Sequence, residues 1–475
     1  MSLTTSPLST DPNGSVLIPS TTGLHRNLGF WHIIVIGLAY IQPMTLFDTF
    51  GLVSQESNFH VPTSYIFALV AVILTSISYG QMIRRYPSAG SAYTYAQQAI
   101  HPNVGFMVGW SSWLDYLLSP MVNIILAKIY LEALFPEVNS WIWVVILTGL
   151  MTAVNMGGAK FVAHFNSWIV FVQLIIIAYF VHLVYHQLNL GHNASGAIAD
   201  QAGAPTLWSS QPFWKNDTHV DNLITGATLL CFSFTGFDAL SSLAEETKDT
   251  KRTLPRAILA TSLIAGVVFI IATYFMQLYF PSDPTQYFDD VGATQPDVLK
   301  IVGGAVFQSW VLGFAIVTVM ASGISAHAGV SRLMYVMGRD DVINKKIFGH
   351  VSPKNRVPTY NIIMVGIVAL AAGFMDFNQV LSLISFGALT AFSFVNLAVI
   401  AKYAVRDGRY KTPVDFFNYV LMPVLGFLCI VALWINIESE ALRAGLIWAA
   451  IGLVYLAYIT GGFKRSAPVH HEFKE

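Results

Sequence analysis

The chain has 475 residues, of which 55% are hydrophobic and only 11% are charged, and its formal net charge is −1 at pH 7. A soluble domain carries about 25% charged residues, so this composition excludes an ordinary water-soluble enzyme and a disordered scaffold. The small net charge offers no basic surface for a nucleic acid partner. The two cysteines, Cys231 and Cys429, lie in apolar runs and imply no disulfide framework.

Twelve stretches are apolar enough to cross a bilayer, which takes about 20 mostly apolar residues. The predicted spans are 30–54, 62–83, 104–134, 140–157, 161–188, 223–243, 258–280, 302–322, 360–374, 380–401, 420–437 and 444–462. They predict an all-α membrane protein with one transmembrane domain over residues 28–463. The polar segments 1–27 and 464–475 are expected to be cytoplasmic tails, and 331–358 to be an amphipathic connector.

Lys and Arg are distributed unevenly over the segments between these spans. If the N-terminus is cytoplasmic, the cytoplasmic segments hold 21 of the 25 Lys and Arg residues, the outer loops hold three, and Lys128 lies within the third span. Because positive residues accumulate on the cytoplasmic side of membrane proteins, the asymmetry favours twelve spans with both termini inside.

The first and sixth spans each contain an interruption at mid-depth. Pro43 removes a backbone donor and crowds the preceding turn, so the first helix should break there. Gly236 permits the sixth helix to unwind. Paired breaks of this kind are typical of inverted-repeat transporters, which bind substrate between them. The alternative is two ordinary kinks without a role in binding.

Three carboxylates lie well within the spans: Asp48, Asp115 and Asp238. A charge at the bilayer centre costs about 2.5–3.5 kcal/mol, so such groups need a wet cavity, a partner or a proton. Asp48 and Asp238 each follow a break, which predicts that both face one cavity. Since Lys128 is the only basic residue inside a span, the cavity should be negative and suit a cationic substrate. The alternative is that an aspartate is protonated or caps a broken helix.

Motifs of other functional classes do not occur in the sequence. It contains no nucleotide-binding Walker loop, no metal-ligand spacing among its 13 histidines and no nucleophile motif of a hydrolase. We therefore expect neither an enzyme nor a protein that holds a metal or another cofactor.

Several stretches resemble the amino acid–polyamine–organocation superfamily. Residues 232–238 (Phe-Ser-Phe-Thr-Gly-Phe-Asp), with 245–247 and 254–255, resemble its sixth-helix signature, and 86–93 resembles its second-loop motif. Residues 37–45, 101–116 and 331–340 are similar to the bacterial putrescine importers within that superfamily.

The resemblance implies a fold and a mode of transport. It implies a LeuT-like fold with a first repeat at about 28–190, a second repeat at about 220–402 and two extra helices at about 418–463. It also implies import of putrescine or a related polyamine across the bacterial inner membrane, driven by protons through alternating access.

Individual roles follow from the same resemblance. Asp238 matches an acidic position that meets substrate, Phe232 matches a gating aromatic, and Tyr116 matches a tyrosine of polyamine recognition. The remaining substrate-binding candidates are Asp115, Phe237, Gly236, Tyr40, Pro43 and Asp48. Some proton-coupled relatives carry a lysine where this chain has Gln173, which cannot titrate. The candidates for proton coupling are therefore Asp238, Asp48 and Glu245.

The first break departs from the superfamily pattern. Amino acid carriers usually have a glycine-rich break whose backbone N–H groups hold the substrate carboxylate, whereas residues 39–43 here read Ala-Tyr-Ile-Gln-Pro. Since bare backbone nests favour anions, this departure favours a substrate without a carboxylate. A carrier or exchanger of a cationic or neutral amino acid remains the alternative, and a receptor that binds without transport is a third hypothesis.

Overall fold

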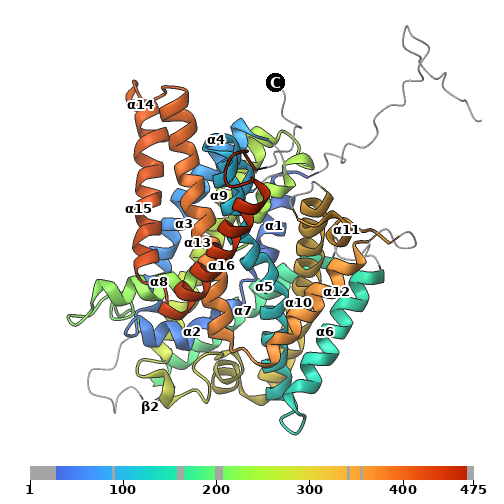
Figure 1. Cartoon of the computed structure of the whole chain (residues 1–475). Coiled ribbons are helices and arrows are strands. Elements are labelled where there is room, and N and C mark those ends of the chain that lie inside the picture. The colour runs from blue at the N-terminus through green and yellow to red at the C-terminus, as the bar shows by residue number, and fades with distance from the viewer. Residues whose placement is uncertain are drawn as a thin grey trace, which may run out of the picture.

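The computed structural model describes residues 28–87, 91–157, 165–197, 207–339, 343–352 and 357–467, and its regular structure is almost entirely helical (Figure 1). The predicted tail 1–27 and residues 468–475 of the other tail lie outside the described residues.

The elements follow one another with short connections. The first half comprises α1 (Phe30–Ile41), α2 (Thr45–Glu56), α3 (Val61–Arg85), α4 (Ala92–Ala99), α5 (Pro102–Leu134), α6 (Ser140–Gly157) and α7 (Phe165–Asn189). A small antiparallel hairpin follows, β1 (His192–Asn193) with β2 (Gly196–Ala197). The rest comprises α8 (Val220–Phe234), η2 (Ala239–Glu245), α9 (Thr250–Tyr279), η3 (Pro284–Gln286), α10 (Gln295–Arg339), α11 (Lys345–Phe348), α12 (Thr359–Ala369), η4 (Leu370–Gly373), α13 (Phe377–Val399), η5 (Ile400–Arg406), α14 (Pro413–Phe416), η6 (Phe417–Leu421), α15 (Met422–Ile435) and α16 (Ser439–Ile459).

The helices match the predicted spans closely. Within the described ranges, ten helices are long and apolar enough to cross a membrane, and α1 with α2 forms a bent pair that passes the same test. The shorter apolar helix Thr359–Gly373, made of α12 and η4, occupies the predicted ninth span. The chain is thus a helical protein with ten or eleven spans of full length, and the twelfth depends on this short helix.

One predicted boundary is wrong. The expected span 302–322 and the connector that begins at residue 331 are parts of one element, because α10 continues to Arg339, with a kink at Gly304 (φ 76°). The mixed polarity after residue 330 is that of an amphipathic helix end. Val330 and Met334 on its apolar side are buried with Phe106 and Trp110 of α5.

Close helix contacts build the centre of the bundle. The long helices α3 and α9 pack along each other, and α5 packs against α10 and α13. A Cβ atom on Gly266 of α9 would lie 2.5 Å from a methyl group of Leu69, so the glycine lets this side chain pack closely against α9. The hydroxyls of Ser76 and Ser262 are 3.1 Å apart across the same interface. Small and polar contacts of this kind hold helices together in lipid, where apolar contact alone does not. In Figure 1, α15 and α6 lie at opposite edges of this bundle.

Candidate functional site

The first helix break lies between α1 and α2. Helix α1 ends at Ile41, Gln42 adopts a left-handed conformation (φ 51°), and α2 begins at Thr45 after a bend of 52°. The hydroxyl of Thr45 donates to the carbonyl of Gln42 at 2.9 Å. The break predicted at Pro43 is therefore confirmed, and proline stands at its centre.

The second break lies between α8 and η2. Helix α8 ends at Phe234, and Gly236 has a φ of 108°, which side chains rarely tolerate. A Cβ atom on Gly236 would lie 2.7 Å from the Cβ atom of Tyr40 and 3.4 Å from the backbone nitrogen of Ile41. The predicted interruption is confirmed, and the two breaks contact each other.

Asp238 turns its carboxylate back onto the second break. Its Oδ1 accepts a hydrogen bond from the backbone N–H of Gly236 at 3.1 Å, and the residue is 8% exposed. The side chain therefore satisfies a backbone donor that the broken helix leaves free. The side chain makes no capping hydrogen bond to η2, so the capping role considered from the sequence is limited to this bond with Gly236.

Asp115 joins Asp238 from the middle of α5. The two carboxylates are close enough to interact electrostatically, although 123 positions separate them in sequence. A Cβ atom on Gly387 of α13 would lie 2.9 Å from the Cβ atom of Asp115, so α13 closes tightly over this position. Within the described ranges, no Lys, Arg or His acts on either carboxylate. The pair is therefore a concentration of uncompensated acid at the breaks.

Two tyrosines lie beside the acidic pair, and a third, Tyr40, lies at the junction of the breaks, where Glu246 and Arg332 act on it. Tyr116 and Tyr79 both lie within electrostatic range of Asp115 and Asp238, and Tyr116 lies within range of Tyr40 as well. Tyr40, in the last turn of α1, is 44% exposed. With Ala39 it lines a cavity of about 20 Å³, whose other walls come from α7 and α10: Ile169, Thr318, Ala321, Ser322 and Ser325. Neither Asp115 nor Asp238 lines this cavity. Tyr79 is an aromatic neighbour of the pair that the sequence did not indicate, and the role of these rings in binding a cationic substrate stays a prediction.

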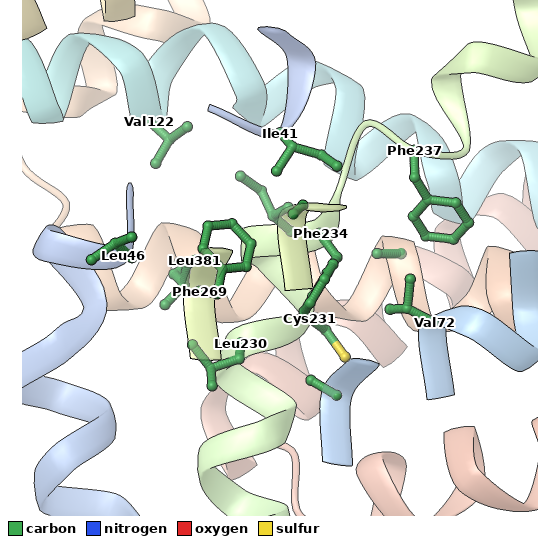
Figure 2. Packing of buried hydrophobic residues seen from close by; sticks show 14 of the residues in the cluster. Ile41, Leu46, Val72, Val122, Leu230, Cys231, Phe234, Phe237, Phe269 and Leu381 are labelled. Carbon is green, nitrogen blue, oxygen red and sulfur yellow. The ribbon is translucent and has the colours of Figure 1, made fainter. Parts of the chain in front are cut away.

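The two phenylalanines of the second break differ in position. Phe232 is partly buried and packs edge-on against Phe377 of α13, with ring centroids 6.1 Å apart. Phe237 is completely buried between Tyr79 and Phe392, at 5.7 and 5.1 Å. Figure 2 shows Phe237 on the far side of the irregular segment from Phe234, in the hydrophobic cluster that also holds Ile41. Phe237 thus anchors the break in the core.

Asp48 lies apart from the acidic pair. Its Oδ2 accepts a hydrogen bond from the hydroxyl of Tyr130 at 2.8 Å, and that hydroxyl also lies 3.2 Å from Oε1 of Gln295. The residue is 0% exposed. The structure brings Asp115 and Asp238 together but places Asp48 in a separate polar cluster, with partners from α5 and α10 that the sequence did not indicate.

Glu245 and Gln173 are the remaining positions that the sequence singled out. Glu245 is the last residue of η2, and its side chain lies outside the described residues. Gln173 of α7 is completely buried. In the part of the chain that the structure describes, no group of three or more His, Cys, Asp and Glu residues is arranged to hold a metal ion.

The sequence is similar to those of known membrane transporters. The family model of amino acid permeases matches residues 32–459. The chain belongs to the amino acid permease family. The permease is 52% identical to the low-affinity putrescine importer PlaP of Escherichia coli (strain K12), over 95% of this chain and 98% of that protein. More distant relatives include the branched-chain amino acid permease BcaP and the methylthioribose transporter of Bacillus subtilis (strain 168), which are 23% and 25% identical over 93% and 92% of this chain and 95% and 94% of those proteins.

Proposed function

We propose that the permease imports putrescine or a closely related polyamine across the bacterial inner membrane as a secondary active transporter. The observation that carries this proposal is the pair of carboxylates, Asp115 and Asp238, placed at the junction of two broken helices without a basic residue acting on them. The carboxylates pair with an ammonium group of the substrate, and the rings of Tyr116 and Tyr40 add cation–π attraction. The 52% identity to a putrescine importer supports the same substrate.

The backbone of the breaks argues against a substrate carboxylate. Pro43 has no N–H group, and the N–H of Gln42 donates to the carbonyl of Leu38 at 3.1 Å. At the second break, the N–H of Gly236 already donates to Asp238. A carrier that binds an amino acid needs free donors for its carboxylate, whereas a diamine needs only acceptors. The amino acid carrier or exchanger remains the alternative because distant relatives are amino acid permeases by name.

The fold that we propose for this function has twelve spans. The bent pair α1–α2 begins the first repeat and the broken α8–η2 begins the second, as expected of a five-plus-five inverted repeat that alternates between two faces. The asymmetry of Lys and Arg supports a cytoplasmic position for both termini.

We also propose that the permease couples uptake of its substrate to the entry of protons. A dication that enters with one or more protons needs a carboxyl group that alternates between protonated and ionised states, and Asp238, Asp48 and Glu245 are the candidates. Gln173 stands where some relatives carry a titratable lysine, so the proton is carried by an acid.

Uptake of radiolabelled putrescine into proteoliposomes tests the proposal. We expect accumulation above the external concentration when the outside is made acidic, and equilibration without accumulation when the gradient is collapsed by a protonophore. Accumulation that ignores the gradient contradicts proton coupling. Binding without any flux supports the receptor hypothesis instead.

A further inference from the structure

A second, smaller cavity lies against the first break. Its volume is about 10 Å³, enough for about one water molecule. The polar residues on its wall are Gln42, Thr45, Asp48, Tyr130, Gln173 and Thr318. They come from the segment after α1 and from α2, α5, α7 and α10, so five parts of the chain meet at this wall.

Hydrogen bonds inside this cavity are incomplete within the described chain. Oδ2 of Asp48 has the Tyr130 hydroxyl as donor, but Oδ1 has no partner. The side chain of Gln173, on the same wall, has no partner at either Oε1 or Nε2. Both residues are 0% exposed. A buried polar group without a partner is costly, so these atoms indicate a missing component of the site.

This cavity can complete either protonation state of Asp48. When Asp48 is ionised, both oxygens accept, and Nε2 of Gln173 supplies a donor for Oδ1 across the cavity, directly or through one water. When Asp48 is protonated, Oδ1 becomes an O–H donor, and Oε1 of Gln173 supplies the acceptor. A carboxyl group that can be completed in both states is suited to bind and release a proton.

The charges around Asp48 agree with a neutral carboxyl. The ionisable groups that face it are two tyrosines, Tyr130 of α5 and Tyr65 of α3, while α7 and α10 contribute the amides Gln173 and Gln295. Across the described ranges, no basic residue acts on Asp48. An ionised carboxylate without a cation is strongly disfavoured in such a place. Asp115 and Asp238 also lack a basic partner but are placed to receive the amine of the substrate, whereas the cavity at Asp48 has room for about one water molecule.

We propose that Asp48, together with Tyr130 and Gln173, forms the proton-binding site of the permease, separate from the acidic pair that binds the amine. This inference rests on the proposed function and assigns one of its three candidate acids.

The position of Asp48 explains how its proton is coupled to movement. Thr294, which directly precedes α10, donates from its hydroxyl to the carbonyl of Phe47 at 2.6 Å and accepts from the N–H of Gly51 at 3.2 Å. These bonds join α2 to the start of α10, while Tyr130 joins Asp48 to α5. Tilting of α2 away from these neighbours exposes Asp48 to water, where it gains or loses its proton.

Two assays on the reconstituted full-length protein test this assignment: accumulation of labelled putrescine under an imposed proton gradient, and exchange of labelled for unlabelled putrescine without a gradient. We expect Asp48→Asn to lose accumulation at least tenfold while exchange stays within about twofold, because exchange needs no net proton movement. The matched control, Asp289→Asn, changes an exposed acid before α10 and should alter neither assay.

The outcomes separate this proposal from the proposed function. Normal accumulation by Asp48→Asn overturns the assignment while leaving putrescine transport in place. Accumulation by the wild type that follows a sodium gradient and ignores a proton gradient overturns it as well. Loss of both assays in Asp238→Asn, by contrast, reports on the amine site alone.

Two further variants keep the test decisive if Asp48→Asn does not fold. Tyr130→Phe removes a donor to the ionised form and should shift the pH at which uptake is half-maximal upward by about 0.5–1 unit. Gln173→Leu removes the amide beside Asp48 and leaves the acid in a less polar cavity, which disfavours its ionised form, so the same midpoint should move upward as well. General destabilisation lowers uptake at every pH without moving the midpoint, and the absence of both shifts contradicts the proposal.

Discussion

The two helix breaks meet in space but are built in different ways. The first follows from proline: Pro43 cannot donate, and Gln42 turns the chain with a φ of 51°. The second depends on glycine: Gly236 adopts a φ of 108°, and the carboxylate of Asp238 satisfies its N–H. At the first break, Nε2 of Gln42 donates a hydrogen bond to Oδ1 of Asn123 in α5, at 3.3 Å. At the second, Asp238, whose side chain accepts from Gly236, is also the candidate ligand for substrate.

This difference indicates that the two breaks have different roles in transport. The first break is held by neutral groups and lies beside the buried Asp48, whereas the second carries its own charge and lies beside Asp115. Changes at the second break should therefore affect substrate binding most, and changes at the first should affect the rate of conformational change.

The largest effect is expected for Asp238→Asn. The variant removes the charge that binds the ammonium group and replaces an acceptor of the Gly236 N–H by an amide. We expect loss of putrescine uptake with normal membrane expression, measured by radiolabelled uptake and immunoblotting. Asp249→Asn is the control, because Asp249 is exposed, has a left-handed backbone that asparagine tolerates and pairs only loosely with Arg252, at 4.0 Å. Near-normal uptake by Asp238→Asn contradicts its role.

Gly236→Ala should have the next largest effect. Its φ of 108° and the 2.7 Å approach of the new Cβ to Tyr40 strain the junction by about 1–3 kcal/mol. We expect at least a tenfold loss of transport rate in proteoliposomes, with a lower unfolding temperature. Gly313→Ala, in α10 with no neighbour within 4 Å of its added Cβ, should behave as the wild type. Equal behaviour of the two variants contradicts the contact between the breaks.

Asp115→Asn should weaken binding without abolishing transport. The variant keeps the shape of the side chain and leaves Asp238 as the single acid, so the ammonium loses one of two attractive charges. We expect the KM for putrescine to rise about tenfold with a smaller change in maximal rate, as measured by uptake at a series of concentrations. An unchanged KM excludes Asp115 from the amine site.

The smallest effect is expected at the first break. Gln42→Ala removes the hydrogen bond to Asn123 and should lower stability by about 1 kcal/mol. We expect a two- to fivefold slower uptake with an unchanged KM. A tenfold rise in KM contradicts the different roles of the two breaks, because it places Gln42 in direct contact with substrate.

The fold was more predictable from the sequence than the site. Pro43 revealed its break because its covalent structure forbids a regular helix, and apolar runs of sufficient length revealed the spans. The end of α10 at Arg339 was missed because an amphipathic helix beyond the bilayer has the mixed polarity of a connector.

Contacts between distant residues explain what the sequence could not show. Asp115 and Asp238 were identified one by one as buried acids, but their proximity depends on how α5 crosses the second break. The expectation that Asp48 and Asp238 share one cavity came from their similar positions after the two breaks. The hydrogen bond from Tyr130 shows instead that α2 directs Asp48 toward α5, and no local pattern encodes that direction.

The central claim is that an acidic junction of two broken helices selects an amine without a carboxylate. Its most direct test is competition for labelled putrescine uptake by unlabelled putrescine and by ornithine, which has the same two amines and differs only by a carboxylate on the carbon beside one of them. We predict that ornithine competes at least tenfold more weakly than putrescine. Competition by ornithine at equal or lower concentration contradicts the claim and identifies the permease as an amino acid carrier.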